Sequence, residues 1–179
     1  AQLLVQNQGG TLNTDNHAIT FSNCNSMTLI LAADTDYLNR RDKGWHGEHP
    51  HERVKADLAL ASKKSFDVLK KEHVEDYQAL FNRFSLRLGE TSARIVQQPT
   101  GDRLNAYKKG TPDAGLEALL CQYARYLMIG SSRPGSLPAN LQGIWNNSNK
   151  PKWGSDFHTD VNMQMNYWFV DMTSLSECF

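Results

Sequence analysis

The spacing of apolar residues changes near residue 50 of this 179-residue chain, and that change limits the folds open to it. Before it, short apolar runs alternate with turn signals such as Gly9-Gly10 and Asp15-Asn16, and the run from Met27 to Ala33 is typical of a buried strand. After it, apolar residues recur at intervals of three and four, which predicts helices. We therefore expect an α+β chain, with short antiparallel strands at the N-terminus followed by α-helices.

Two helical stretches are predicted between residues 54 and 84, separated at the charged residues Lys70 to Glu72. The polar residues 39–50, which precede them, have the glycines and proline of a linker. Ser85 to Gly89 alternates and is compatible with a strand, whereas residues 90–110 lack periodicity and predict a loop with one short helix.

A third helix is predicted to start at Thr111-Pro112-Asp113, which offers an N-cap, a proline for the first turn and an acidic residue near the positive end of the helix dipole. We expect Gly130 to stop it and one apolar stripe to be buried, made of Leu116, Leu119, Leu120, Tyr123 and Leu127. From Val161 the helical pattern returns and continues to Phe179 without a stop signal. The chain is thus expected to begin inside one folding unit and to end inside another.

Residues 131–179 combine aromatic rings with amides, carboxylates and a histidine. Trp145, Trp153 and Trp168 lie among these polar side chains. Aromatic rings can cover the apolar face of a sugar while polar groups bind its hydroxyls. Buried amides are costly unless they are hydrogen-bonded, so the segment is either a polar structural cluster or part of a ligand-binding wall.

Asp160 and Asn162 are the sharpest candidate pair in this segment. Residues two apart point about 200° away from each other on a helix but share a face on an extended backbone. If both contact one ligand, the following helix must begin at or after Asn162; alternatively, Asp160 simply caps that helix. His158 is compatible with hydrogen bonding to a sugar or general acid catalysis, and also with a structural role.

Composition excludes several classes of function. Lysine plus arginine and aspartate plus glutamate number 19 each, which argues against a nucleic-acid partner, and no stretch approaches the roughly 20 apolar residues of a membrane span. The three cysteines form no metal motif and are expected to be buried thiols. The spacing of His46, His49 and His51 matches no standard zinc site, so we expect no metal and no cofactor.

Two long sequence motifs resemble those of a known family. PANLQGIWN (Pro138 to Asn146) and WGSDFHTDVNMQMNYW (Trp153 to Trp168) resemble the signature of glycoside hydrolase family 95, mainly α-L-fucosidases with some α-L-galactosidases. Earlier segments agree in the same order: residues 27–37 resemble the end of the family's N-terminal β domain, and residues 73–89 resemble the segment that enters its catalytic domain. Residues 119–135 resemble the first barrel helix and the loop that follows it. The resemblance covers nearly the whole chain.

The resemblance implies a layout of three parts. Residues 1–38 would be the C-terminal part of a β-sandwich, 39–89 a linker with helices, and 90–179 the incomplete start of an (α/α)6 catalytic barrel. An incomplete barrel exposes apolar helix faces, so self-association through such a face is expected. The implied substrate is a fucosylated oligosaccharide or a plant or host glycan, and the implied location of the parent protein is secreted or periplasmic.

The resemblance also implies an inverting mechanism with named residues. In the family a glutamic acid protonates the leaving oxygen, and two asparagines in an H-T-N-x-N context hold the attacking water, one of them polarised by a distant aspartate. The matching positions here are Asp160 and Asn162, so an aspartate replaces the first asparagine. Substrate contacts are expected from Gln142, Trp145, Trp153 and His158.

No match to the glutamic acid or to the polarising aspartate occurs in these 179 residues, so the chain alone is expected to be inactive. The W-P-A-E that usually follows the motif is also changed, to Trp168-Phe169-Val170-Asp171. Two other interpretations remain open: a carbohydrate-binding module without hydrolysis, and a purely structural domain.

Overall fold

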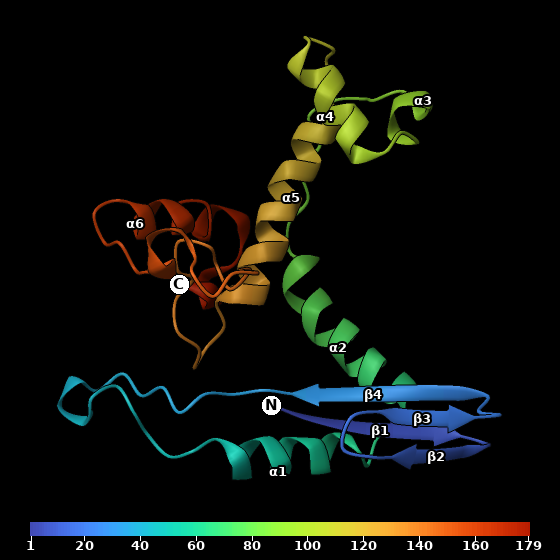
Figure 1. The fold of residues 1–179 in the computed structure, drawn as a ribbon. Helices are drawn as coiled ribbons and strands as arrows, with labels where there is room; N and C mark the ends of the chain where they lie inside the picture. Colours follow the sequence, from blue (N-terminus) through green and yellow to red (C-terminus); the bar gives the residue numbers. More distant parts are fainter. The chain divides into compact units, whose positions relative to one another are not determined.

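The computed structural model describes residues 1–179, which divide into two compact units, Ala1–His73 and Val74–Phe179 (Figure 1). The first unit contains all four strands, and the second is built from helices and long loops. This confirms the mixed α+β composition predicted from the change of periodicity. None of the helices combines the length and the apolar character needed to cross a membrane.

The strands of the first unit form two antiparallel pairs. β1 (Gln2–Gln8) pairs with β4 (Ser26–Ala32), and β2 (Thr11–Thr14) pairs with β3 (Ile19–Ser22). Asp15-Asn16 forms the turn between the paired strands β2 and β3, whereas at Gly9-Gly10 the chain bends between β1 and β2, which do not pair with each other. Gly10 has a φ of 63°, and a Cβ there would lie 2.1 Å from the carbonyl oxygen of Ser22. The Asp15 carboxylate accepts hydrogen bonds from the backbone N–H groups of His17 and Ala18.

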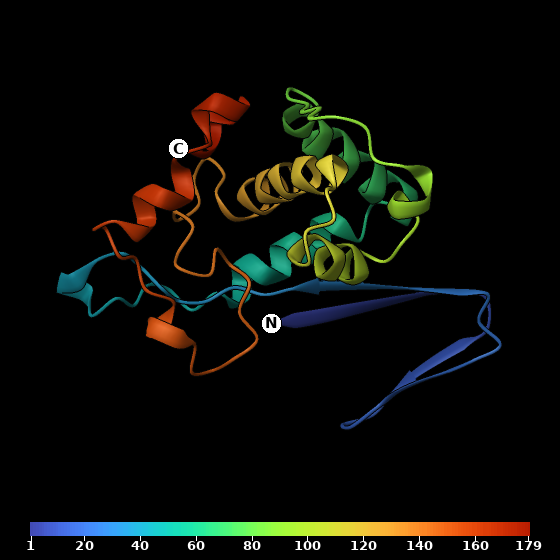
Figure 2. The ribbon, with the colours of Figure 1, turned by 90° about the horizontal axis from the view of Figure 1, so that it is seen from above.

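The helix α1 (His51–Ala61) lies against β1 and β4, as both views of the ribbon show (Figures 1 and 2). It buries Val54 and Leu58, which lie four residues apart and therefore on one face of the helix. Gln6 Nε2 donates to the carbonyl oxygen of Ser62 at 3.2 Å and ties the end of α1 to the first strand. A short 3₁₀ turn, Arg41–Lys43, lies in the loop between β4 and α1.

The break between α1 and α2 (Phe66–Phe81) occurs at residues 62–65, so the predicted break at Lys70 to Glu72 is wrong. Serine hydroxyls close both helix ends: Ser62 Oγ donates to the carbonyl of Ala59, and Ser65 Oγ accepts from the backbone N–H of Val68. The charged residues instead lie on the surface of α2, where Glu72 pairs with Lys64 Nζ at 2.6 Å.

The helices of the second unit are α3 (Ala93–Val96), α4 (Thr100–Lys108), α5 (Ala114–Ser131) and α6 (Asn162–Tyr167). Three 3₁₀ turns follow α5, at Lys152–Ser155, Asp171–Thr173 and Ser176–Cys178. The buried core joins the end of α2, the second half of α5 and the C-terminal turns, and consists of Leu80, Met128, Ile129, Val170, Leu175 and Cys178.

Two predictions for residues 85–110 are wrong. Ser85 to Gly89 is not a strand, because no other strand of this unit pairs with it. Residues 90–110 contain two helices where one was expected. The second, α4, begins after Pro99, whose carbonyl accepts hydrogen bonds from Asp102 and Arg103.

The helix α5 differs from its prediction at both ends. Its N-cap is Asp113, two residues after the predicted Thr111, because the Asp113 carboxylate accepts from the backbone N–H of Leu116 at 2.9 Å. The helix also continues past Gly130 to Ser131, so Gly130 does not stop it.

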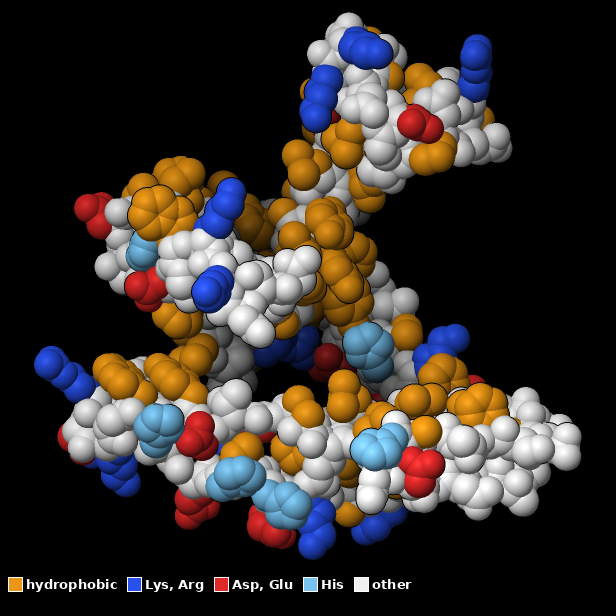
Figure 3. All heavy atoms as spheres, viewed as in Figure 1, with side chains coloured by type: hydrophobic (Ala, Val, Ile, Leu, Met, Phe, Trp, Pro, Cys, Tyr) orange, Lys and Arg blue, Asp and Glu red, His pale blue; other side chains and the backbone are white.

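The predicted apolar stripe of α5 is mostly exposed. Leu116 is buried, but Leu119, Leu120 and Tyr123 are exposed. In the space-filling view, hydrophobic side chains gather on the surface over α5 (Figure 3). The buried face instead contains Arg125, Met128 and Ile129. An internal arginine interrupts the apolar pattern, which is why periodicity selected the wrong face.

The predicted helix from Val161 to Phe179 ends at Tyr167 and is replaced by 3₁₀ turns. Ser174 has a left-handed φ of 59°, and the backbone N–H of Leu175 reaches back to Val170 at 3.0 Å, which buries Val170 and Leu175. The expectation of three buried thiols is correct only for Cys178; Cys24 and Cys121 are partly exposed.

Candidate functional site

The loop between α5 and α6 carries most of the predicted site and is folded by its own backbone. Asn140 and Gly143 exchange backbone hydrogen bonds across a tight turn, and Leu141 N donates to the carbonyl oxygen of Asp156 at 3.2 Å. Gln142 Nε2 donates to the carbonyl of Lys152 at 3.3 Å. Residues 140–143 are therefore fixed beside residues 152–156, and Gln142 lies next to the segment that presents Trp153.

Trp145 packs on two glycines. A Cβ at Gly130 would lie 3.2 Å from the ring atoms Cζ2 and Cη2, and one at Gly143 would lie 3.0 Å from Cε3. Gly143 also has a φ of 67°, which other residues rarely adopt. The glycine that the sequence pattern suggested as a helix stop thus makes room for a tryptophan ring.

Gln142 and Trp145 line a cavity of about 390 Å³ between α5, α6 and this loop. Other lining residues include Leu127, Met165 and Asn166. Its volume falls in the range of small-molecule sites, and its mostly apolar wall with a few amides suits a ring with hydroxyl groups.

Trp153 and His158 form a second group on the surface. Their rings meet edge to face, with the ring centroids 6.1 Å apart and an angle of 76° between the ring planes. His158 Nε2 lies 3.8 Å from Asp156 Oδ2. Trp153 is 76% exposed and has a left-handed φ of 56°, so its backbone holds the ring outward. These two residues are not among those lining the cavity.

Asp160 does not cap α6. The N-cap is Val161, no side chain caps the helix, and α6 begins at Asn162. The alternative role of Asp160 as a helix cap is therefore wrong, and α6 begins at Asn162, as a shared ligand would require. The residue between the pair, Val161, has φ of −128° and ψ of 0°, so the backbone there turns instead of being extended. Both side chains are exposed, and the structure records no hydrogen bond to either. A backbone hydrogen bond closes the turn that contains both residues: the carbonyl of His158 accepts from Met163 N at 2.8 Å.

A chain of hydroxyls positions α6 and was not predicted. Ala139 N donates to the Tyr167 hydroxyl at 2.8 Å, which donates to Ser132 Oγ at 2.8 Å, which donates to the carbonyl of Cys178 at 2.7 Å. Asn166 Nδ2 adds a bond to the carbonyl of Asn140 at 3.1 Å. Asn166 thus ties helix to loop, as in a polar structural cluster, whereas Tyr167 and Ser132 carry no sequence signal of this role.

The structure contains no cluster of three or more potential metal ligands. Three histidines lie close together in sequence around the start of α1. Of these, His46 Nδ1 pairs with Asp36 Oδ2 at 2.8 Å, and His51 Nδ1 contacts Gln2 Nε2 at 3.0 Å. His49 Nδ1 accepts from the backbone N–H of His51 at 3.3 Å. Their ring nitrogens are directed to separate partners rather than to one centre.

Comparison with known proteins points to one family. Residues 65–179 match the sequence profile of the glycosyl hydrolase family 95 catalytic domain. The chain is 45% identical over 154 residues to "Probable alpha-fucosidase A" of Aspergillus niger, covering 83% of this chain and 19% of the relative. It is 35% identical over 181 residues to "Alpha-L-fucosidase 2" of Arabidopsis thaliana, covering 99% of this chain and 21% of the relative. The chain thus spans about a fifth of the length of these curated relatives.

Proposed function

The chain belongs to glycoside hydrolase family 95, and from this membership we propose that it supplies the water-holding side of an inverting exo-glycosidase site. The proposed parent activity is hydrolysis of terminal α-L-fucosyl residues of glycans, with α-L-galactosyl residues as the closest alternative. Relatives named alpha-fucosidase support the choice of sugar. The family resemblance supports a further proposal that residues 90–179 form the start of an (α/α)6 barrel.

One observation carries the assignment of the water-holding pair. Asp160 lies two residues before α6, and Asn162 is the first residue of that helix. Neither side chain caps the helix. An amide can only orient a water molecule, whereas a carboxylate can also accept its proton. We propose that Asp160 strengthens the base side of the site or shifts the substrate preference, while Asn162 orients the water.

The substrate-binding roles follow from the two groups on the loop. Gln142 and Trp145 line the cavity, and Trp153 with His158 offers an exposed ring beside a hydrogen-bonding imidazole. We propose that these four side chains contact sugar residues of the glycan. Secretion or a periplasmic location of the parent protein is proposed with them, since such glycans are presented outside the cell.

The test is Asp160→Asn in the full-length protein, assayed on aryl α-L-fucosides and aryl α-L-galactosides. We expect a changed rate on fucosides or a changed ratio between the two substrates. Asp171→Asn is the matched control, because it removes an exposed carboxylate from a neighbouring 3₁₀ turn. Unchanged rates and an unchanged ratio for Asp160→Asn would sink the proposal.

A second test concerns the 179 residues alone. Since they contain no match to the family's glutamic acid, we propose that these 179 residues have negligible activity toward an aryl α-L-fucoside. Measurable turnover by the purified chain would refute this. Saturable sugar binding without turnover in the parent protein would favour the alternative of a carbohydrate-binding module, which the exposed Trp153 ring supports.

A further inference from the structure

A loop of the first unit presents two exposed aromatic rings far in sequence from the residues discussed above. Tyr37 and Trp45 have nearly parallel planes, 2° apart, with ring centroids separated by 6.5 Å. Tyr37 is 48% exposed and Trp45 is 46% exposed. The two rings are stacked, and each keeps about half of its surface open to solvent.

The backbone fixes both rings. Tyr37 forms an isolated antiparallel bridge with His46, Leu38 N donates to the Trp45 carbonyl at 2.9 Å, and Gly47 N donates to the carbonyl of Asp36 at 2.6 Å. Trp45 has a left-handed φ of 67°, which is unusual for a bulky residue and persists only where the surroundings enforce it. Such strained positions concentrate at ligand-binding sites.

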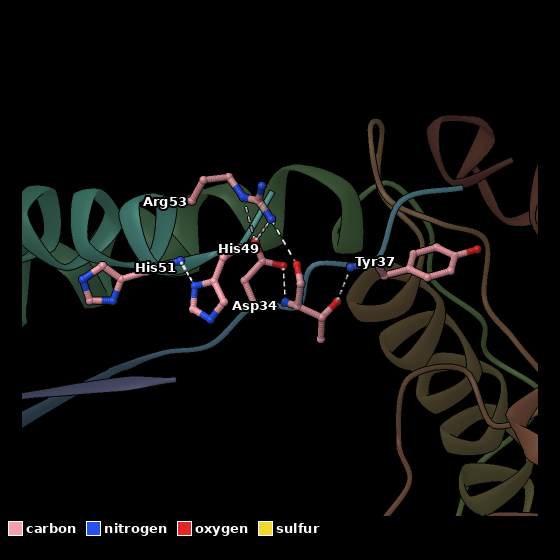
Figure 4. Close-up of polar contacts among 6 residues, drawn as sticks. Asp34, Tyr37, His49, His51 and Arg53 are labelled. Carbon is pink, nitrogen blue, oxygen red and sulfur yellow. Dashed lines mark hydrogen bonds and ion pairs between the residues drawn. The ribbon is translucent and has the colours of Figure 1, made fainter. Parts of the chain in front are cut away.

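The loop is also anchored to α1, as the close-up shows (Figure 4). Arg53 Nε donates to Asp34 Oδ2 at 2.9 Å, and Arg53 Nη2 donates to the carbonyl of Thr35 at 3.1 Å. The Thr35 hydroxyl in turn accepts from the backbone N–H of Tyr37 at 3.3 Å. A ligand that binds the rings therefore has little loop to order, which lowers the entropic cost of binding.

A polar pair accompanies the rings. His46 Nδ1 lies 2.8 Å from Asp36 Oδ2, and the side chains are 73% and 45% exposed. The hydrogen bond from His46 lowers the pKa of the Asp36 carboxyl from its usual value, so the carboxylate stays ionised over the neutral range. An ionised carboxylate accepts hydrogen bonds from hydroxyl groups, and its charge disfavours an anionic ligand.

We propose that Tyr37 and Trp45, with Asp36 and His46 beside them, form a sugar-binding surface that takes a neutral pyranose of a glycan. Aromatic rings cover the apolar face of a pyranose, and the carboxylate and imidazole are suited to its hydroxyls. The choice of a glycan as ligand rests on the proposed function. The surface itself rests on the first unit alone, so it extends sugar contact beyond the loop between α5 and α6.

The experiment uses the ¹⁵N-labelled 179-residue chain and the indole N–H signals of its four tryptophans. Each signal is assigned with a single Trp→Phe variant, and 2′-fucosyllactose is titrated, with sorbitol as a non-cyclic polyol control. We expect the Trp45 signal to shift saturably with 2′-fucosyllactose and not with sorbitol. Tyr37→Ala should weaken that response about fivefold, since it removes one of two stacking rings.

Tyr123→Ala is the matched control, because Tyr123 is an exposed tyrosine that also stacks on a neighbouring ring, in the second unit. It should leave the Trp45 response unchanged. The inference is overturned if Trp45 does not respond, if only Trp145 or Trp153 responds, or if Tyr37→Ala binds like the original chain. It is also overturned if the Trp45 signal shifts with protein concentration alone, which would mean that a second copy covers the rings.

Failure of this inference and failure of the proposed function are distinguishable. The proposed function is tested by hydrolysis in the full-length protein with Asp160→Asn, a residue of the second unit. The Trp45 response is a binding measurement on the first unit and requires no turnover.

Discussion

Replacing Arg125 by methionine tests what holds the second unit together. Arg125 lies in the middle of α5 and is fully buried, with no carboxylate as partner. Its guanidinium donates instead to four carbonyl groups, those of Leu80, Phe81, Phe84 and Thr173, and to the side chain of Gln122. Its Cζ also lies 5.3 Å and 5.2 Å from the ring centroids of Phe81 and Phe84.

The size of the effect follows from these partners. Of the four carbonyls, those of Phe81 and Thr173 accept only from Arg125, whereas Leu80 also accepts from Arg83 N at 3.3 Å and Phe84 also accepts from Gln122 Nε2 at 3.0 Å. Methionine fills most of the volume but donates nothing, so the carbonyls of Phe81 and Thr173 lose their donor; each unsatisfied buried group costs about 1–3 kcal/mol. Burial lowers the pKa of Arg125, so removing the charge returns part of that cost. We expect a net destabilisation of about 3 kcal/mol.

Urea unfolding, followed by tryptophan fluorescence, measures this change, because three of the four tryptophans lie in the second unit. A loss of about 3 kcal/mol corresponds to a fall in melting temperature of roughly 12–24 °C for a unit of this size. Arg87→Met is the control, since Arg87 is exposed and pairs only with Glu90. If Arg125→Met unfolds within about 0.5 kcal/mol of the original chain, as surface substitutions do, the guanidinium does not support the carbonyls as argued.

Three further predictions concern charge, surface and thiol. Hydrogen bonds from Arg103 hold the pKa of Asp113 at about 2, below its usual 3.8, so the stabilisation from this carboxylate is complete above about pH 4 and is lost as the pH falls toward 2. Asp113→Asn should therefore flatten the acid transition in a circular-dichroism titration, and superimposable curves would contradict this. The exposed face of α5 should drive self-association, so Leu120→Glu should shift the chain toward monomer in light scattering. A chain that is monomeric at every concentration before the substitution would contradict this. Burial raises the pKa of the Cys178 thiol, so iodoacetamide should modify Cys24 well before Cys178 under native conditions; equal rates by mass spectrometry would show that Cys178 is open.

The strands were predictable because their signals are local. Alternation and turn residues specify a hairpin without reference to distant residues, and Gly10 and Asp15 act where the sequence placed them. The helix ends were less predictable because distant side chains choose among local options. Thr111 and Asp113 are both good N-caps, but Arg103 and Thr91 converge on the Asp113 carboxylate, which makes Asp113 the cap.

The buried face of α5 shows a second limit of prediction from sequence periodicity. Periodicity ranks apolar residues as buried and excludes arginine, yet Arg125 is more buried than any leucine of the predicted stripe. Its burial depends on carbonyls supplied by residues more than forty positions away in both directions of the chain. The end of the chain fails for a related reason, because the left-handed Ser174 converts a helical pattern into turns that bury Val170 and Leu175.

The candidate sugar-binding tryptophans share a backbone feature that the periodicity of the sequence does not detect. Trp45 and Trp153 are both exposed, and both have left-handed backbone with φ values of 67° and 56°. Each is adjacent to a glycine that is itself left-handed, Gly44 before Trp45 and Gly154 after Trp153. A surface tryptophan held by packing would bury its ring, whereas one held by its backbone leaves the ring free for a ligand. The dipeptides Gly-Trp and Trp-Gly in polar loops are thus a local sign of an aromatic ring presented outward, and in this chain they occur only at these two rings.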